Sequence, residues 1–103
     1  MPAWVEDGVT PHPTGGYVRV ITNDHNTLYL DADGKSHRLD GPAITRQDRG
    51  SAGWWKHGRP HRFDGPAVVR ENGSSEWWLE GAPMSEAAHT AIVERLRATG
   101  EAP

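Results

Sequence analysis

The chain has 103 residues, no cysteine and a formal net charge of −3. These values predict one small domain without disulfide bonds and favour a cytoplasmic location, while the mild acidity argues against a nucleic acid partner. No apolar run approaches the length that crossing a bilayer requires, so we expect no membrane insertion.

Two nearly identical octets show that the chain is built from repeats. HRLDGPAI begins at His37 and HRFDGPAV begins at His61. Alignment on the glycine four residues before each arginine extends the pattern to Gly8, Gly34, Gly58 and Gly81. It predicts four units over residues 4–29, 30–53, 54–76 and 77–84. Each copy of such a repeat buries its apolar face by stacking on its neighbours.

The units are expected to be β-hairpins in chain order. The first has strands over 17–22 and 27–31, the second turns at 47–50, and the third turns at Asn72-Gly73, a pair that takes the positive φ values of a tight hairpin turn. A helix over 85–99 follows, with Ser85 as its N-cap and an apolar stripe that covers the last exposed part of the sheet. The stripe consists of Ala88, Ile92, Val93 and Leu96.

These elements define the predicted fold class. It is mainly β, with stacked β-hairpin repeats in a single-layer meander and one C-terminal helix. The spacing Trp55-x-x-Gly58-x-x-His61 resembles the MORN repeat, and the longer pattern WWxxGxxHRxDGPA is similar to a MORN-like variant found in small phage and bacterial proteins. The Tyr-x-Gly opening of the MORN repeat is missing, and the last unit lacks the histidine. The resemblance implies stacked hairpins and a scaffold for interactions.

Two units contain a pair of adjacent tryptophans, and neighbours on a strand point to opposite faces. The two positions of the pair, followed through all four units, therefore give two sets of equivalent residues, here called columns. One column is apolar throughout and is expected in the core: Trp4, Leu30, Trp54 and Trp77. The other contains an aspartate and is expected to be partly exposed: Val5, Asp31, Trp55 and Trp78. Trp55 and Trp78 are therefore candidates for a binding surface. The alternative, that both columns are mainly structural, is favoured because a small domain needs the burial of its indoles.

The repeated His-Arg-x-Asp elements offer a chemical interpretation. His37, Asp40, His61 and Asp64 could bind a metal ion or supply a general base. Their recurrence in each unit favours a structural role instead, in which histidine and aspartate exchange hydrogen bonds inside each turn. No catalytic residue is assigned, and no cofactor is expected.

Four arginines recur in the same frame and could join the tryptophans in a binding surface: Arg38, Arg62, Arg46 and Arg70. Guanidinium groups beside indoles suit a small phosphorylated ligand, a nucleotide or an acidic patch on a protein. The alternative is that the arginines pair with Glu71, Glu76 and Glu80 along the sheet. We favour that alternative because the chain is acidic overall.

The leading functional hypothesis is a non-catalytic protein interaction module. The resemblance implies a small phage or bacterial accessory protein that binds and modulates a host or partner protein, in the host cytoplasm if it is phage-encoded. The second hypothesis is a small-ligand or nucleotide-binding protein that uses arginine and tryptophan. The third is a metal-dependent hydrolase. A repeat sheet could also associate end to end as a homo-oligomer, unless the helix covers that end.

Overall fold

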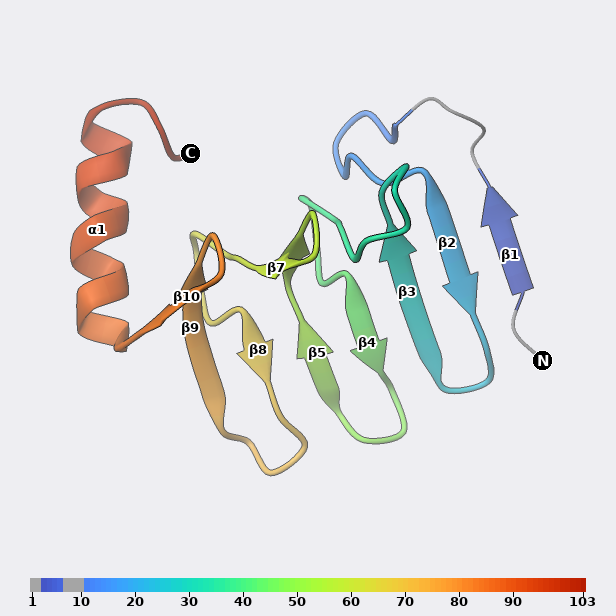
Figure 1. Ribbon diagram of the computed structural model, residues 1–103. Helices are drawn as coiled ribbons and strands as arrows, with labels where there is room; N and C mark the ends of the chain where they lie inside the picture. The colour runs from blue at the N-terminus through green and yellow to red at the C-terminus, as the bar shows by residue number, and fades with distance from the viewer. Residues whose placement is uncertain (1–2, 7–10) are drawn as a thin grey trace.

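The computed structural model describes residues 3–6 and 11–103 of the chain (Figure 1). Gly8 and the side chains of Trp4 and Val5, which the sequence assigns to the first unit, lie outside what is described. The described residues form ten strands and one helix. These elements are β1 (Ala3–Glu6), β2 (Arg19–Thr22), β3 (Asn26–Leu30), β4 (Ile44–Arg46), β5 (Ser51–Gly53), β6 (Trp55–Lys56), β7 (Arg59–Pro60), β8 (Val68–Val69), β9 (Ser75–Leu79), β10 (Ala82–Met84) and α1 (Glu86–Ala98).

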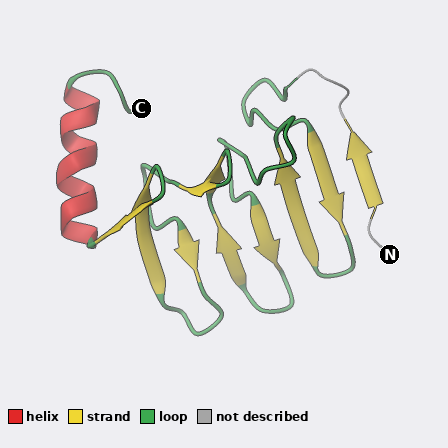
Figure 2. Cartoon of the chain, viewed as in Figure 1, coloured by secondary structure: helices red, strands yellow, loops and turns green. Residues whose placement is uncertain are grey.

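Eight strands form one antiparallel sheet in the order β1-β2-β3-β4-β5-β8-β9-β10. Strands β6 and β7 make a separate two-stranded ladder beside it. The hairpins lie side by side in chain order, with β1 at one end and α1 at the other (Figures 1 and 2). The prediction of a mainly β hairpin meander with a single C-terminal helix is therefore confirmed.

Strand register corrects the alignment of the two aromatic columns. Three residues pair in the same way with the strand or bridge that follows them: Leu30 with Ser36, Trp55 with Pro60, and Trp78 with Pro83. Leu30 is therefore equivalent to Trp55 and Trp78. Its neighbour Tyr29 takes the place of Trp54 and Trp77. The predicted column that contained Leu30 is wrong by one position in the second unit.

A longer turn causes this shift. Between paired residues, the chain after β3 is one residue longer than the chain after β6 or β9. The shorter turns, His57-Gly58 and Glu80-Gly81, have positive φ at both positions, with 48° at each non-glycine residue. These are the angles of a two-residue hairpin turn. Gly34 also has positive φ, so the longer turn contains a glycine just as the shorter turns do. Aligning the sequence on these glycines therefore hid the extra residue.

The hairpin predicted at Asn72-Gly73 is present, but its turn is not the two-residue type. The Arg70 N–H donates to the Ser74 carbonyl over 2.9 Å, which leaves three residues in the loop. Gly73 has a φ of 85°, while Asn72 does not have positive φ. The Asn72 side chain instead accepts hydrogen bonds from the backbone N–H and the hydroxyl of Ser74. Local side-chain bonding of this kind favours the longer loop.

Helix α1 begins where the sequence predicts. Ser85 is the N-cap, and its Oγ accepts a hydrogen bond from the Ala88 N–H over 3.1 Å. The predicted apolar stripe is only partly correct, because Ile92 is 40% exposed while His89 and Val93 are buried. His89 and Val93 lie four residues apart and therefore on the same helix face.

His89 attaches α1 to the end of the sheet. Its ring lies edge-on to Trp77, with 4.9 Å between ring centroids. Its Nε2–H donates to the backbone carbonyl of Arg62 over 2.6 Å. The helix therefore packs, through His89, on the last aromatic residue of the column formed by Tyr29, Trp54 and Trp77. Among the described residues, no helix has both the length and the hydropathy that crossing a bilayer requires.

The cap of α1 gives a first test of the fold. Replacing Ser85 with alanine leaves the Ala88 N–H without its acceptor, so we expect the free energy of unfolding to fall by about 1 kcal/mol. Urea denaturation followed by circular dichroism measures this change. Thr90→Ala is the matched control, because Thr90 is an exposed hydroxyl residue inside the helix. An equal loss of stability in both variants would contradict the capping role.

Candidate functional site

Two histidines link neighbouring repeat units. His37 and His61 are buried, at 3% and 8% relative exposure. The Nδ1 of His37 accepts a hydrogen bond from the His57 N–H over 3.0 Å, and the Nδ1 of His61 accepts one from the Glu80 N–H over 2.9 Å. Each donor is the first residue of the tight turn in the next unit. The predicted exchange of hydrogen bonds between histidine and aspartate inside one turn is wrong.

Burial lowers the pKa of both imidazoles, because a low-dielectric environment disfavours the charged form. Around His37, His57 and Lys56 also lower the pKa, whereas Asp31 raises it. Around His61, Glu80 raises the pKa, whereas Lys56 and His89 lower it. The net direction is downward for both, which favours the neutral rings that accept a backbone N–H at Nδ1.

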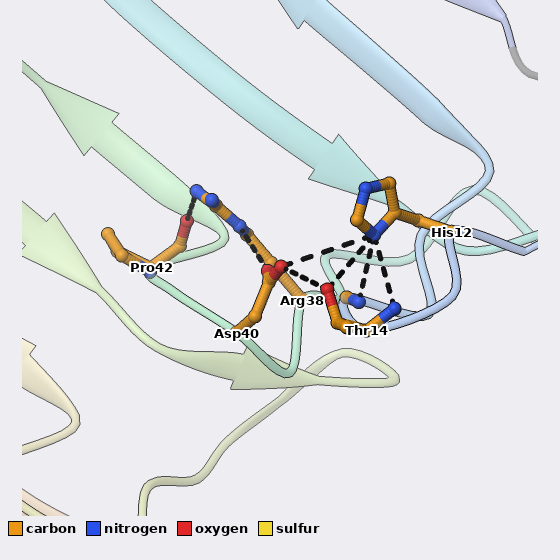
Figure 3. A network of polar contacts seen from close by, with 6 residues as sticks. His12, Thr14, Arg38, Asp40 and Pro42 are labelled. Atoms are coloured by element: carbon orange, nitrogen blue, oxygen red, sulfur yellow. Dashed lines mark hydrogen bonds and ion pairs between the residues drawn. The ribbon is translucent and has the colours of Figure 1, made fainter.

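Arginine and aspartate of each octet form a second repeated arrangement. The Nε of Arg38 donates to Asp40 over 2.8 Å, and the Nε of Arg62 donates to Asp64 over 2.9 Å. Each guanidinium also donates to the carbonyl of a proline, Pro42 or Pro66. Figure 3 shows the first of these arrangements, with Asp40 between Arg38 and the side chains of Thr14 and His12.

Each guanidinium also lies over an aromatic ring. Arg38 is 4.1 Å from the centroid of Tyr29, and Arg62 is 4.0 Å from that of Trp54. Burial raises the pKa of Asp40, but hydrogen bonds from Arg38 and Thr14 outweigh it and leave the pKa lowered. The hydrogen bond from Arg62 lowers the pKa of Asp64. Both arginines are therefore held within the fold by a carboxylate, a carbonyl and a ring.

The proposed metal ligands are not brought together. In residues 3–6 and 11–103, no group of three or more histidine and acidic side chains could hold a metal ion. His37 and His61 use their Nδ1 atoms for backbone N–H groups, while Asp40 and Asp64 bind arginines. This geometry gives the metal-dependent hydrolase hypothesis no support.

Asp31 has a role that the sequence reasoning missed. It is 5% exposed, which overturns the expectation that an aspartate marks an exposed column. Its Oδ1 accepts the N–H groups of Asp33 and Lys35, both over 2.9 Å, and closes the longer turn after β3. Its Oδ2 lies 2.7 Å from the Nδ1 of His57. An Asp-x-x-Gly sequence at 31–34 is the signal that could have indicated this turn.

The contact between Asp31 and His57 crosses from one unit to the next. The His57 ring also stacks on that of His37, with 3.9 Å between centroids. The next junction has a different pair in a similar place, in which the Nζ of Lys56 donates to Glu80 over 2.7 Å. Polar side-chain contacts between turns therefore recur along the stack, although the residue types change.

Two open grooves lie on the described part of the chain, and they share no lining residue. The first, here called the Trp55 groove, has a volume of about 460 Å³ and lies over β4, β5 and β8. Trp55 and three arginines line it: Arg46, Arg49 and Arg70. The second, called the Trp54 groove, has a volume of about 680 Å³ and lies between the two His-Arg-x-Asp elements.

The residues that the sequence predicts as one binding surface do not all line the same groove. Trp55, Arg46 and Arg70 lie together in the Trp55 groove, whereas Arg38 and Arg62 line the Trp54 groove. Trp78 lines neither, and its indole N–H donates to Glu76 over 3.1 Å. Both tryptophans are half-buried. The six predicted residues are therefore not one surface.

Three arginines and one carboxylate, that of Glu71, line the Trp55 groove. Arg70 pairs with Glu76 over 2.6 Å, as the alternative interpretation of the arginines expects. The guanidinium groups of Arg46 and Arg49 have no partner among the residues that the structure describes. Sequence reasoning missed Arg49, because it lies in the turn between β4 and β5 and has no counterpart in the repeat. Two arginines without a described partner therefore line this groove together with the Trp55 indole.

No family model matches the chain, and no curated protein or solved structure is significantly similar to it.

Proposed function

We propose that this chain is a MORN-like repeat protein that acts without catalysis, by binding an acidic segment of another protein in the Trp55 groove. The sequence motifs and the hairpin meander support the repeat assignment. The observation that carries the functional proposal is the position of Arg46 and Arg49, two unpaired arginines at one open groove beside Trp55. In the cell the protein would be an accessory factor that modulates this partner by occupying its acidic segment.

The composition of the groove favours a protein partner. Tryptophan and arginine are the residues that most often dominate the energy of protein interfaces. Ile44, Val68 and Val69 add apolar surface around the charges. An acidic segment with one apolar side chain would neutralise the two arginines and cover the Trp55 ring. Opposite charges would also speed the encounter of the two proteins.

A small phosphorylated ligand is the second candidate, and the same residues favour it. Three arginines and an indole within one groove could hold a phosphate and stack on a base. The sequence pattern predicts Arg38 and Arg62 in this role. Their bonds to Asp40 and Asp64 make Arg46 and Arg49 the better candidates.

The test compares two double variants with the same change in net charge. Arg46→Glu/Arg49→Glu reverses the charges in the Trp55 groove, while Lys35→Glu/Arg59→Glu reverses two exposed charges that do not line it. Tagged proteins are used to capture partners from a lysate of the source organism, and the captured protein is identified and titrated by calorimetry. We expect the first variant to bind its acidic segment at least about tenfold more weakly and the control to bind like the wild type.

Three outcomes would contradict the proposal. Equal losses in the two variants would show general charge attraction. Binding to a segment without acidic residues would exclude the proposed recognition. A phosphorylated small molecule that co-purifies with the wild type and is lost in the first variant would favour the second candidate.

A further inference from the structure

The chain already contains a peptide segment that docks on one of its own repeat units. Residues 12–17 lie against residues 37–40 of the second unit (Figure 3). The Leu39 N–H donates to the Gly15 carbonyl over 2.8 Å. The Thr14 hydroxyl donates to the Oδ2 of Asp40, also over 2.8 Å. Both bonds use polar groups of the repeated octet.

Aromatic and glycine contacts complete this docking. The ring of Tyr17 lies edge-on to Tyr29, with 4.7 Å between centroids, beside the guanidinium of Arg38. Gly16 has a φ of 71°, and a Cβ atom there would lie 2.8 Å from the Nε2 of His37. Only glycine fits this close approach with this backbone conformation. The docked pattern is thus a hydroxyl residue, two glycines and an aromatic residue.

The third unit repeats the surface that receives this segment. Residues 61–64 correspond to residues 37–40, and Arg62 lies over Trp54 as Arg38 lies over Tyr29. The hydrogen bonds of Arg62 to Asp64 and to Pro66 match those of Arg38. The surface of the third unit is therefore built in the same conformation.

In the third unit, however, no described segment binds the corresponding polar groups. The Phe63 N–H, which corresponds to that of Leu39, and the Oδ2 of Asp64 have no hydrogen-bond partner within the described residues. The Asp64 side chain is 67% exposed, against 31% for Asp40 under Thr14. The position that a docked segment would occupy on the third unit is the Trp54 groove, which is lined by residues of both octets and, on the side of the helix, by Arg97 and Pro103.

A buried ring nitrogen at the same groove gives independent support. His61 lines the Trp54 groove and its side chain is only 7% exposed. Its Nδ1 accepts the Glu80 N–H, so its Nε2 carries the proton in the neutral ring. That Nε2 is buried without a hydrogen-bond partner among the described residues. A buried donor without an acceptor is unfavourable, and an occupant with a carbonyl oxygen would satisfy it.

We propose that the Trp54 groove binds a segment of a partner protein with the pattern Thr/Ser-Gly-Gly-aromatic, in the way that residues 14–17 bind the second unit. The hydroxyl donates to Asp64, the first glycine carbonyl accepts from the Phe63 N–H, and the aromatic ring lies beside Trp54 and Arg62. A volume of about 680 Å³ is within the range of ligand-binding clefts. This site is separate from the Trp55 groove and goes beyond the function proposed above.

The test uses a synthetic peptide with capped ends and the sequence of residues 11–18, Pro-His-Pro-Thr-Gly-Gly-Tyr-Val. It is titrated into the full-length, ¹⁵N-labelled protein up to about 5 mM, because a short peptide with few bonds should bind with a Kd of about 0.1–1 mM. We expect shifts of the Phe63 and Asp64 amides and of the Trp54 indole. A peptide with alanine in place of the second glycine should not bind.

Protein variants localise the effect. Asp64→Ala should weaken peptide binding at least about fivefold, since it removes the acceptor of the hydroxyl. Asp33→Ala, which removes an exposed carboxylate elsewhere, should not. The ¹⁵N spectrum of each variant shows whether it is folded. Arg46→Glu/Arg49→Glu should bind the peptide like the wild type, so failure at one groove is distinguishable from failure at the other.

Several results would overturn this inference. They are the absence of shifts at the highest peptide concentration, shifts confined to Leu39 and Asp40, or equal binding of the alanine peptide. An increase in molecular mass of the peptide-free protein that Asp64→Ala abolishes would also overturn it, because the occupant would then be a second copy of this chain.

Discussion

Replacing Trp77 with alanine is expected to lower the free energy of unfolding by about 3 kcal/mol and to detach α1 from the sheet. Trp77 is half-buried, and its ring supports the ring of His89, the helix residue that also binds the Arg62 carbonyl. Without the indole, His89 loses its packing and the helix loses its main contact with β9. Urea denaturation measures the stability, and hydrogen exchange of the α1 amides reports the detachment.

Trp78→Ala is the matched control for this prediction. Trp78 is the neighbouring indole, is also half-buried, and has its polar contact with Glu76 instead of the helix. Its replacement should lower global stability through lost burial while the α1 amides stay as protected, relative to the rest of the sheet, as in the wild type. Wild-type protection of α1 in the Trp77→Ala variant would show that the helix is held by other contacts.

Acidification is expected to destabilise the fold in two stages. Burial lowers the pKa of His37 and His61 below the unfolded value of about 6.5, so the unfolded chain binds protons more readily. Stability is therefore fully present above about pH 6.5 and falls as the pH decreases through the folded pKa values. A second loss should follow below about pH 4, because the pKa values of Asp31, Asp40 and Asp64 are also lowered. Urea denaturation at a series of pH values measures both stages.

A double variant separates the histidines from the carboxylates. In His37→Asn/His61→Asn, each amide oxygen can accept the backbone N–H that Nδ1 accepts now, but it cannot be protonated in this range. The first stage should disappear even if overall stability is lower. His25→Asn, in the exposed turn between β2 and β3, should keep the first stage. A wild-type stability that does not change between about pH 7 and pH 5 would contradict the role of the buried rings.

Local signals account for what the sequence predicts correctly. The octets at His37 and His61 identify repeats, and the alternation of strand and turn residues identifies hairpins. The Ser85 cap and the change of periodicity locate α1 within one residue at each end. These features depend on neighbouring residues, so a single sequence is sufficient to show them.

Contacts between units are what the sequence does not show. The insertion after β3 moves Tyr29 into the aromatic column and buries Asp31, and no periodic pattern reports a single extra residue. His89 faces the sheet although it is polar, because Arg62 offers a carbonyl at that place. Trp55 lines a different groove from Arg38 and Arg62, although all three belong to the repeated pattern. Such long-range geometry is not encoded in spacing alone.

His37 and His61 each bind the turn of the following unit in the same way. Whole repeat units can therefore be added to or removed from this sheet. Both junctions use a histidine and a backbone N–H at equivalent positions of the repeat, while different elements, β1 and α1, lie at the two ends of the sheet. A duplication of residues 37–60 in the gene would therefore create one more junction of the existing kind and leave both ends intact. Lineages could lengthen or shorten the sheet by whole hairpins without redesigning its interior.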